Sequence, residues 1–405
     1  MDRISAYLVA GALDHAPSRL SENAAKAFQG STVLGAGFTF DDAAAEQDEA
    51  EPIARMKQLQ KNSANAGRIK PYIGGEEVNN SPSHAFYRYV IDFEEFPLRR
   101  DTTATPRWSE LTEKERSACL RTGIVPADYL EPVAEDWPEL LEIIDRRVRP
   151  VRSGNSRERY AKIWWQHAER RPGLYRAIAR RARVIVNSSK ASPHHALTFL
   201  PANFIFTQNL NVFALDRFCS LCVLQSRAHE LWARFVGTTM KDDFTYAKED
   251  CFETFPFPLN YESNPTLETA GQSYHDHRAA LMVAANEGMT KTYNRFHDAD
   301  EGSDAIARLR ELHDAMDRAV LRAYGWDDLA DELRPVFLTE ETEDDHTYQG
   351  RYFWPAEARD RVLARLLALN AERHAEELAA GRASTTVNSK AERDVDDAQD
   401  NLDLE

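Results

Sequence analysis

The segment Asp250-Cys251-Phe252-Glu253-Thr254-Phe255-Pro256-Phe257-Pro258 marks the point at which the character of the chain changes. Before it, short apolar runs such as Val184-Ile185-Val186 and Leu197 to Phe206 are typical of buried strands, and a helix is expected from about Arg217 to Phe235. After it, apolar residues recur at helical spacing, as in Ile306, Leu309, Leu312, Met316 and Val320. The pattern therefore predicts an α+β protein. The Phe-Pro run is expected to pack its mixed α/β part onto its helical part.

Upstream of this segment, Val33 to Phe40 and Tyr87 to Phe93 have the composition of strands. The Gly35-Ala36-Gly37 in the first of them lacks a third glycine and an opening helix, so a phosphate-binding loop is not expected. Residues 101–137, rich in Thr, Pro and charge, suggest an insertion or a long loop. Residues 1–30 are expected to be a connecting segment with a helical run from Arg19 to Phe28.

Downstream, residues 272–297, 303–324 and 355–379 have helical periodicity and are expected to form a bundle separate from the mixed domain. From Ala383 the chain has almost no apolar residues and ends in a run of acids, which predicts a disordered acidic tail. The expected division is a connecting segment at 1–30, a mixed domain at 31–258 with a possible insertion at 101–137, a helical domain at 259–382 and the tail at 383–405.

Composition limits the class of protein. The 405 residues are 42% hydrophobic and 29% charged, enough for ordinary globular cores. No run approaches the length of a membrane span and the first residues lack the order of a signal peptide, so the cytoplasm is the expected compartment. Four cysteines are too few for a disulfide framework in so long a chain.

The Cys219–Cys222 pair and the histidine pairs are weighed against metal binding. Cys219 and Cys222 form a CxxC without a second Cys or His pair, and their apolar neighbours favour a buried helix over a zinc site. His194-His195 and the pair His275 and His277 lack the carboxylates of a closed metal site, so polar or interhelical roles are favoured. No metal site is predicted.

The net charge of −16 argues at first against nucleic acid, whose phosphates attract Lys and Arg. The stretch from Arg146 to Lys190, however, has fourteen basic residues and two acidic ones, a net charge of +12 that leaves −28 on the rest of the chain. A solvated helix face is the alternative, but such faces usually balance their charges with acids four residues away, which are scarce here. The asymmetry favours a polyanion-binding surface.

Several segments in consistent order, from about residue 28 to residue 380, resemble the post-catalytic part of the MmeI-like DNA adenine-N6 methyltransferases of restriction-modification systems. They are Phe28-Gln29-Gly30-Ser31, Val33 to Phe40, Pro71 to Glu77, Tyr89 to Phe93, Trp164-Trp165-Gln166, Asp250 to Pro258, Tyr274 to Arg278, Thr290 to Asp298, Leu309 to His313 and Ala323 to Trp326. The resemblance implies a target-recognition region that binds double-stranded DNA, followed by the family's helical region.

The chemistry of that family is not found in this sequence. There is no Asn-Pro-Pro-Tyr or Asp-Pro-Pro-Tyr tetrad to hold an extruded adenine, no glycine-rich cofactor loop, and no convincing nuclease arrangement of acids and lysine. We therefore expect no catalytic residues here. S-adenosylmethionine is expected in a methyltransferase partner or a missing domain, joined by a nuclease in those systems of the family that have one. The chain resembles a separately encoded or truncated recognition subunit. Two alternatives stay open: an intact enzyme whose chemistry is not recognised, and a decayed fragment or inhibitor-like acidic protein without a DNA function.

Two groups of residues are the candidate DNA contacts. Arg157, Arg159, Lys162, Arg170 and Arg171 are expected at the phosphate backbone, with Ser188, Ser189 and Lys190 as weaker candidates for backbone or base contact. The resemblance implies that Lys241 and Asp243, two residues apart, read one base pair. A lysine can donate to guanine and a carboxylate can accept from cytosine, although a solvated polar loop with a local ion pair would have the same composition. Trp164 and Trp165 are more typical of packing than of DNA contact.

Overall fold

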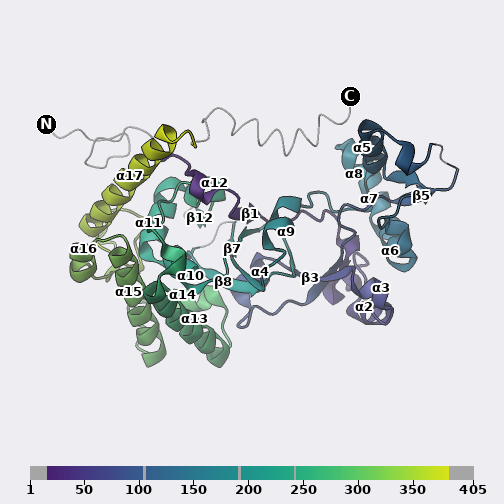
Figure 1. The fold of residues 1–405 in the computed structure, drawn as a ribbon. Coiled ribbons are helices and arrows are strands. Elements are labelled where there is room, and N and C mark those ends of the chain that lie inside the picture. Colours follow the sequence, from purple (N-terminus) through teal and green to yellow (C-terminus); the bar gives the residue numbers. More distant parts are fainter. Residues whose placement is uncertain (1–15, 104–105, 190–192, 241–242, 383–405) are drawn as a thin grey trace.

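The computed structural model describes residues 16–103, 106–189, 193–240 and 243–382. Figure 1 shows an elongated molecule with two small sheets in the middle, long helices at one end and a lobe of short helices at the other. The predicted α+β class is confirmed. The predicted acidic tail at 383–405 lies outside the described residues.

The central sheet has four antiparallel strands in the order β1-β10-β7-β8. Its members are β1 (Ala27–Gln29), β7 (Arg183–Ser188), β8 (Leu197–Pro201) and β10 (Leu210–Phe213). The apolar run Val184-Ile185-Val186 is fully buried, as predicted for an inner strand. Because the pairings are antiparallel, the end of β1, the end of β7 and the starts of β8 and β10 meet at one edge of the sheet.

A second sheet adjoins the first and has the order β2-β4-β3-β9, with β3 and β9 parallel. Its strands are β2 (Thr39–Phe40), β3 (Ile69–Ile73), β4 (Arg88–Ile91) and β9 (Ile205–Phe206). Gly37 lies so close to the helical lobe that an added Cβ would be 2.6 Å from the Cβ of Arg147. The Gly35-Ala36-Gly37 run therefore serves close packing.

The lobe of short helices packs on this second sheet. Its helices are α1 (Asp42–Glu46), α2 (Ile53–Leu59), α3 (Ser63–Ala66), α5 (Glu113–Thr122), α6 (Pro138–Arg147), α7 (Arg149–Ser153) and α8 (Glu158–Lys162). Trp164 and Trp165 lie in its core, and Trp165 Nε1 donates to the carbonyl of Phe96 at 2.9 Å. The predicted packing role of the two tryptophans is confirmed.

Residues 101–137 do not form a long loop. They contain α5, a parallel pair of β5 (Arg99–Asp101) and β6 (Ile124–Pro126), and buried residues such as Val125 and Val133. Thr112 and Glu115 form a capping box at the start of α5, and Gly123 ends the helix with φ of 74°. These are sequence-readable start and stop features that outweigh the polar composition of the stretch.

The prediction of a helix from Arg19 to Phe28 is wrong. Ser21–Asn23 is a single 3-10 turn, and Ala27–Gln29 is strand β1. The Asn23 side chain donates to the carbonyls of Phe252 and Phe255, and the backbone N–H of Ser21 donates to Glu377. These long-range bonds and the pairing of β1 with β10 override local helical propensity.

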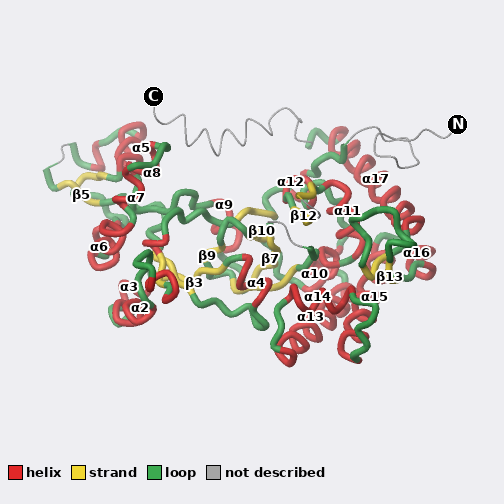
Figure 2. Tube along the Cα trace, turned by 180° about the vertical axis from the view of Figure 1, so that it is seen from behind, coloured by secondary structure: helices red, strands yellow, loops and turns green. Residues whose placement is uncertain are grey.

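The remaining helices lie around the central sheet and at the far end of the molecule (Figure 2). They are α4 (Gly75–Asn80), α9 (Pro172–Ile178), α10 (Phe218–Gln225), α11 (Arg227–Val236), α12 (Lys248–Cys251), α13 (Pro265–Ala285), α14 (Met289–His297), α15 (Asp304–Ala323), α16 (Asp327–Glu332) and α17 (Ala356–Ala379). Two hairpins complete the chain: β11 (Thr238–Met240) with β12 (Asp243–Thr245), and β13 (Val336–Leu338) with β14 (Arg351–Phe353).

One cluster of buried residues runs from the central sheet through α10 and α11 into α13, α15 and α17. At the crossing of α10 and α13, a Cβ on Gly271 would lie 2.2 Å from the carbonyl oxygen of Phe218. Phe252, Phe255 and Phe257 belong to the same cluster, and the hydroxyl of Tyr324 donates to the carbonyl of Pro256 at 2.9 Å. The Phe-Pro run thus packs the mixed part onto the helical part, as predicted. The proposed boundary at residue 258 is crossed by this core.

Candidate nucleic-acid interface

The basic stretch from Arg146 to Lys190 is divided by the fold among α6 to α9 and β7. Many of its cations meet carboxylates from outside the stretch. Arg146 and Arg147 share Glu51, at 2.7 and 2.5 Å. Arg149 pairs with Asp145 at 2.9 Å and Arg181 with Asp216 at 3.1 Å. The net charge of the stretch therefore overstates the charge left for a polyanion, because sequence counting misses partners that only folding brings near.

Arg152 has a structural role. Its side chain is buried and donates to the carbonyls of Val33, Leu34, Trp164 and Gln166, at distances between 2.5 and 3.3 Å. Burial lowers the pKa of Arg152 to about 10. The guanidinium ties the loop before β2 to the segment that holds the two tryptophans.

The first three candidate backbone contacts lie on or next to α8. Arg157 and Lys162 are exposed, and Arg159 is half-buried. Lys162 Nζ lies 2.8 Å from Glu158, and Arg157 Nη1 donates to the hydroxyl of Tyr160 at 2.9 Å. Exposed ion pairs of this kind are worth about 0 to 1 kcal/mol, so a phosphate can compete with the carboxylate.

The other two candidates precede α9, beside the central sheet. Arg170 lies 3.3 Å from Glu95 and bonds to Gln166. Arg171 has a left-handed backbone with φ of 56° and contacts both Glu169 and Gln29. Its Nε is buried without a hydrogen-bond partner. The five arginines and lysines are thus split between the lobe around α8 and the start of α9 (Figure 1).

The edge of the central sheet where β7 ends carries the next candidates. Ser188 is the last residue of β7, and Ser189 follows it. The N–H of Ser189 donates to the carbonyl of Asn209 at 2.9 Å, and its hydroxyl donates to the carbonyl of Gln208 at 3.3 Å. Lys190 lies outside the described residues.

One residue of the proposed base-reading pair, Asp243, belongs to the β11–β12 hairpin. Lys241 lies outside the described residues, and Asp243 opens β12 with its backbone opposite Met240. Tyr246 follows the hairpin, and its carbonyl accepts from the Asn211 side chain at 3.1 Å. Asn211 is in β10 and also donates to Asn187 of β7 at 3.0 Å. The fold therefore brings the hairpin and the end of β7 to the same edge of the sheet.

Sequence reasoning missed a polar group at this edge. Gln29 Nε2 donates to the carbonyl of Gln208 at 2.9 Å, and the hydroxyl of Thr32 donates to Gln208 Oε1 at 2.7 Å. Gln208 is exposed. No local pattern marks these residues, because they come from two segments far apart in sequence, the end of β1 with the residues after it and the turn between β9 and β10. The isolated bridge between Ser31 and Thr207 is what places them side by side.

The histidines have the polar and interhelical roles that were predicted. His277 Nε2 lies 2.8 Å from the carbonyl of Ala305, linking α13 to the start of α15. His275 packs between Phe199 and Phe218, with ring centroids 5.4 Å apart in both contacts. Cys219 and Cys222 are buried in α10, as the core interpretation predicted. Within the described ranges, no three His, Cys, Asp or Glu side chains are placed to hold a metal ion.

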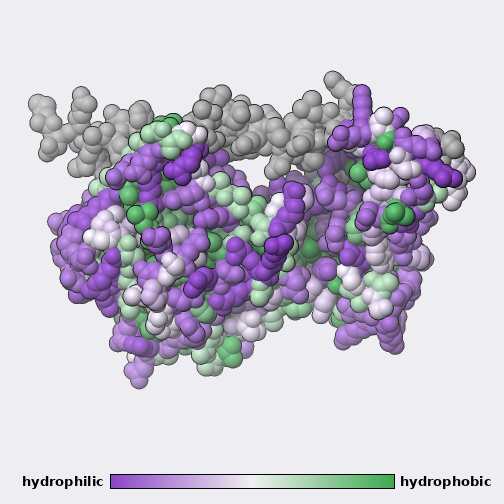
Figure 3. All heavy atoms as spheres, in the orientation of Figure 1, coloured by the Kyte–Doolittle hydropathy of each residue, from purple (hydrophilic) through white to green (hydrophobic). Residues whose placement is uncertain are grey.

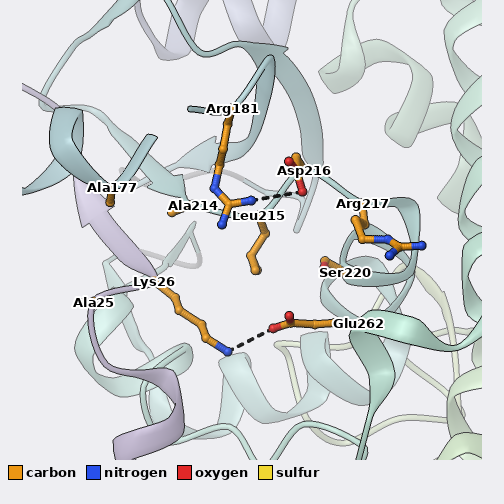
Figure 4. A pocket seen from close by; sticks show the side chains of 10 residues that line it. All are labelled: Ala25, Lys26, Ala177, Arg181, Ala214, Leu215, Asp216, Arg217, Ser220 and Glu262. Atoms are coloured by element: carbon orange, nitrogen blue, oxygen red, sulfur yellow. Dashed lines mark hydrogen bonds and ion pairs between the residues drawn. The ribbon is translucent and has the colours of Figure 1, made fainter. Parts of the chain in front are cut away.

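A polar pocket of about 360 Å³ opens between β1, α9 and the start of α10 (Figure 4). Lys26 faces Glu262 at 3.0 Å across it, and Arg181 faces Asp216 at 3.1 Å. Each of these two cations is matched by a carboxylate, so the pocket offers no strong excess of positive charge.

No helix in the described part of the chain is long and apolar enough to cross a membrane.

Comparison with known proteins finds a family match that includes the segments at this edge of the central sheet. The family model of the MmeI target recognition domain matches residues 128–259. Residues 128–259 are thus similar to the MmeI target recognition domain. The matched range contains α6 to α12, the strands β7 to β12 and every candidate contact from Arg157 to Asp243.

The MmeI-like fold extends beyond the matched domain. The solved structure of the Type IIL restriction-modification enzyme MmeI in complex with DNA is similar to 92% of this chain, with a TM-score of 0.53 and 15% sequence identity. The chain covers 39% of the length of that MmeI structure. No curated protein sequence matches the chain.

Proposed function

We propose that this chain selects the DNA sequence on which an MmeI-like restriction-modification enzyme acts. The observation that carries the proposal is the MmeI target recognition domain match at 128–259, because it coincides with the edge where separate polar segments gather. MmeI itself was solved in complex with DNA, and this chain shares its fold over nearly the whole described length.

In this proposal, the basic residues at α8 and α9 contact phosphates, and the polar residues at the edge of the central sheet contact bases. Arg157, Arg159 and Lys162 at α8 and Arg170 and Arg171 at α9 hold the sugar-phosphate backbone and fix the register of the duplex. Lys241 and Asp243 of the hairpin read one base pair in the major groove. Ser188, Ser189 and Lys190, at the end of β7, contact the backbone or an adjacent base.

The chemistry is proposed to belong to another domain or subunit. The 405 residues lack the tetrad that holds an extruded adenine, so a methyltransferase domain or partner would bind S-adenosylmethionine and carry out the methyl transfer. The purified chain should therefore transfer no methyl group from S-adenosylmethionine to DNA. Incorporation of labelled methyl groups by the chain alone would contradict this assignment.

Salt dependence of duplex binding tests the DNA-recognition proposal. Each phosphate neutralised by Lys or Arg adds about 0.9 to the slope of log affinity against log salt. Replacing Arg157, Arg159 and Lys162 together by Ala should lower the slope by about 2 to 3, measured by fluorescence anisotropy between 50 and 200 mM salt. Arg157 and Lys162 are exposed and Arg159 is half-buried, so the fold should survive the triple substitution.

The matched control removes the same charge elsewhere. Arg308, Arg322 and Arg365 lie on the surface of the helical end, in exposed ion pairs with Glu311, Asp331 and Asp328. Hydrophilic residues cover most of that end (Figure 3). Replacing these three by Ala should leave the slope within experimental error. Equal slopes for the two triple variants would contradict the proposed backbone contacts, and no binding of any duplex would overturn the proposed function.

A further inference from the structure

The residues Pro193, His194 and His195, here called the return arm, lead the chain back from the β7–β8 loop into β8. Arg351 Nη2 donates to the carbonyl of Pro193, and Arg234 Nη2 approaches the same oxygen at 3.4 Å. Arg234 is in α11 of the recognition domain. Arg351 is in β14, more than ninety residues beyond the end of the matched domain. One carbonyl of the return arm is thus held from two parts of the chain.

The Arg351 side chain is largely buried, and neighbouring groups hold it beside the Pro193 carbonyl. Its side chain is 11% exposed, its Nε donates to the carbonyl of Thr347 at 3.0 Å, and its Nη1 lies 3.8 Å from Glu230. Glu230 also pairs with Arg234 at 2.8 Å, so one buried carboxylate serves two arginines. Burial lowers the pKa of Arg351 to about 10. A buried guanidinium is costly unless its donors are used, which the arm's carbonyl helps to achieve.

The two histidines of the arm are held by the same scaffold. The His194 ring stacks on Tyr293 and His297 at 5.8 and 5.3 Å between centroids, and its Nε2 lies 2.6 Å from Asn294 Oδ1. All three partners are in α14. The His195 ring stacks on Tyr246, which follows the base-reading hairpin, at 5.8 Å. The arm is therefore in contact with the helical end on one side and with the hairpin on the other.

We propose that Arg351 is a positioning residue for sequence recognition, which holds the return arm in register with the β11–β12 hairpin. The inference rests on the proposed DNA-recognition function and adds to it a residue outside the recognition domain. It gives the helical end a role in specificity, because a base contact needs its side chain placed within about 0.5 Å. Loss of the contact should broaden sequence preference and leave the phosphate contacts in place.

The test compares specificity with affinity. The preferred duplex of the full chain is first obtained from randomised duplexes, and binding is then measured to that duplex, to single-substitution duplexes and to an unrelated one. A good base contact contributes about tenfold or more in discrimination. Arg351→Ala should reduce discrimination by about that factor at one or two adjacent positions, while affinity for the unrelated duplex stays within twofold of that of Arg361→Ala. Arg361→Ala is the control, because this substitution removes the same charge from an exposed pair with Glu332.

Two further variants keep the test valid if Arg351→Ala fails to fold. Arg351→Lys retains one donor for the Pro193 carbonyl and should recover part of the discrimination. Asn294→Ala releases His194 without touching a charge and should weaken discrimination at the same positions. Equal discrimination in Arg351→Ala and Arg361→Ala, or a loss of affinity spread evenly over all sequences, would overturn the positioning role and leave the proposed function standing. If the unaltered chain itself binds without any preference, the proposed function fails first.

Discussion

The buried ion pair between Arg227 and Asp317 joins α11, within the matched residues 128–259, to α15 of the helical end, and its removal should destabilise both together. The two side chains are 1% and 2% exposed, with Arg227 Nη1 2.5 Å from Asp317 Oδ2. The N–H of Arg227 donates to Asp317 Oδ1 at 2.8 Å, and Nη2 donates to the carbonyl of Tyr352 at 3.2 Å. Burial alone would raise the pKa of Asp317, but Arg227 and His313 outweigh it and hold that pKa below its usual range.

Asp317→Asn keeps the volume of the side chain and removes its charge, so the cost comes from an uncompensated buried guanidinium. Breaking such a pair costs about 3 to 5 kcal/mol. The corresponding substitution in an exposed pair, Glu332→Gln opposite Arg361, should cost far less, because water solvates both side chains. Replacing both buried partners with apolar residues, Arg227→Met with Asp317→Leu, should cost less than Asp317→Asn alone, because no buried charge is left without a partner.

Urea unfolding followed by tryptophan fluorescence and far-ultraviolet circular dichroism measures these differences. With a dependence of about 3 kcal/mol per molar urea, the midpoint of Asp317→Asn should fall by roughly 1 to 1.7 M. Both signals should shift together, because the core that contains Trp232 and Trp354 crosses residue 258. A shift no larger than that of Glu332→Gln would refute the reasoning. A first transition seen by circular dichroism alone, while the tryptophan fluorescence stays native, would also refute the reasoning.

Three further predictions concern pH, packing and specificity. Burial lowers the pKa of His84 and His194 to about 4, so the unfolded chain binds more protons between that value and about 6.5. Their contribution to stability is therefore complete above pH 6.5 and is lost as the pH falls toward 4. Protonation of each histidine in the unfolded chain lowers the free energy of unfolding by up to about 2 to 3 kcal/mol. A melting temperature that is unchanged between pH 7.5 and 5 would contradict this prediction. Gly271→Ala should destabilise by about 1 to 3 kcal/mol, since its Cβ would overlap the carbonyl of Phe218, whereas Gly302→Ala meets no atom within 4 Å and should melt like the parent. Lys241→Glu combined with Asp243→Arg should invert the preferred base pair at one position of the selected site; retention of the original site with weaker binding would remove both residues from base recognition.

Local patterns predicted several elements of the central sheet and of the helical end. The buried run Val184-Ile185-Val186 is strand β7, and the spacing of Ile306, Leu309, Met316 and Val320 gives the buried face of α15. The strands expected within Leu197 to Phe206 are present as β8 and β9, and the expected helix from Arg217 to Phe235 is broken once, at Ser226. The errors occur where contacts distant in sequence decide. Arg19 to Phe28 is not helical, because Asn23 and Ser21 are bound by residues more than two hundred positions away.

The sequence by itself indicated the α+β class and the resemblance to MmeI, since periodicity and motif order are local properties. Only the tertiary structure decided which charges are available, because Glu51 and Asp216 approach the basic stretch through folding. It also decided that the end of β7, the β11–β12 hairpin and residues around Gln208 meet at one edge, and that Arg351 reaches the return arm from the far end of the chain. Antiparallel pairing and a continuous core set these distances, and neither can be inferred from spacing along the chain.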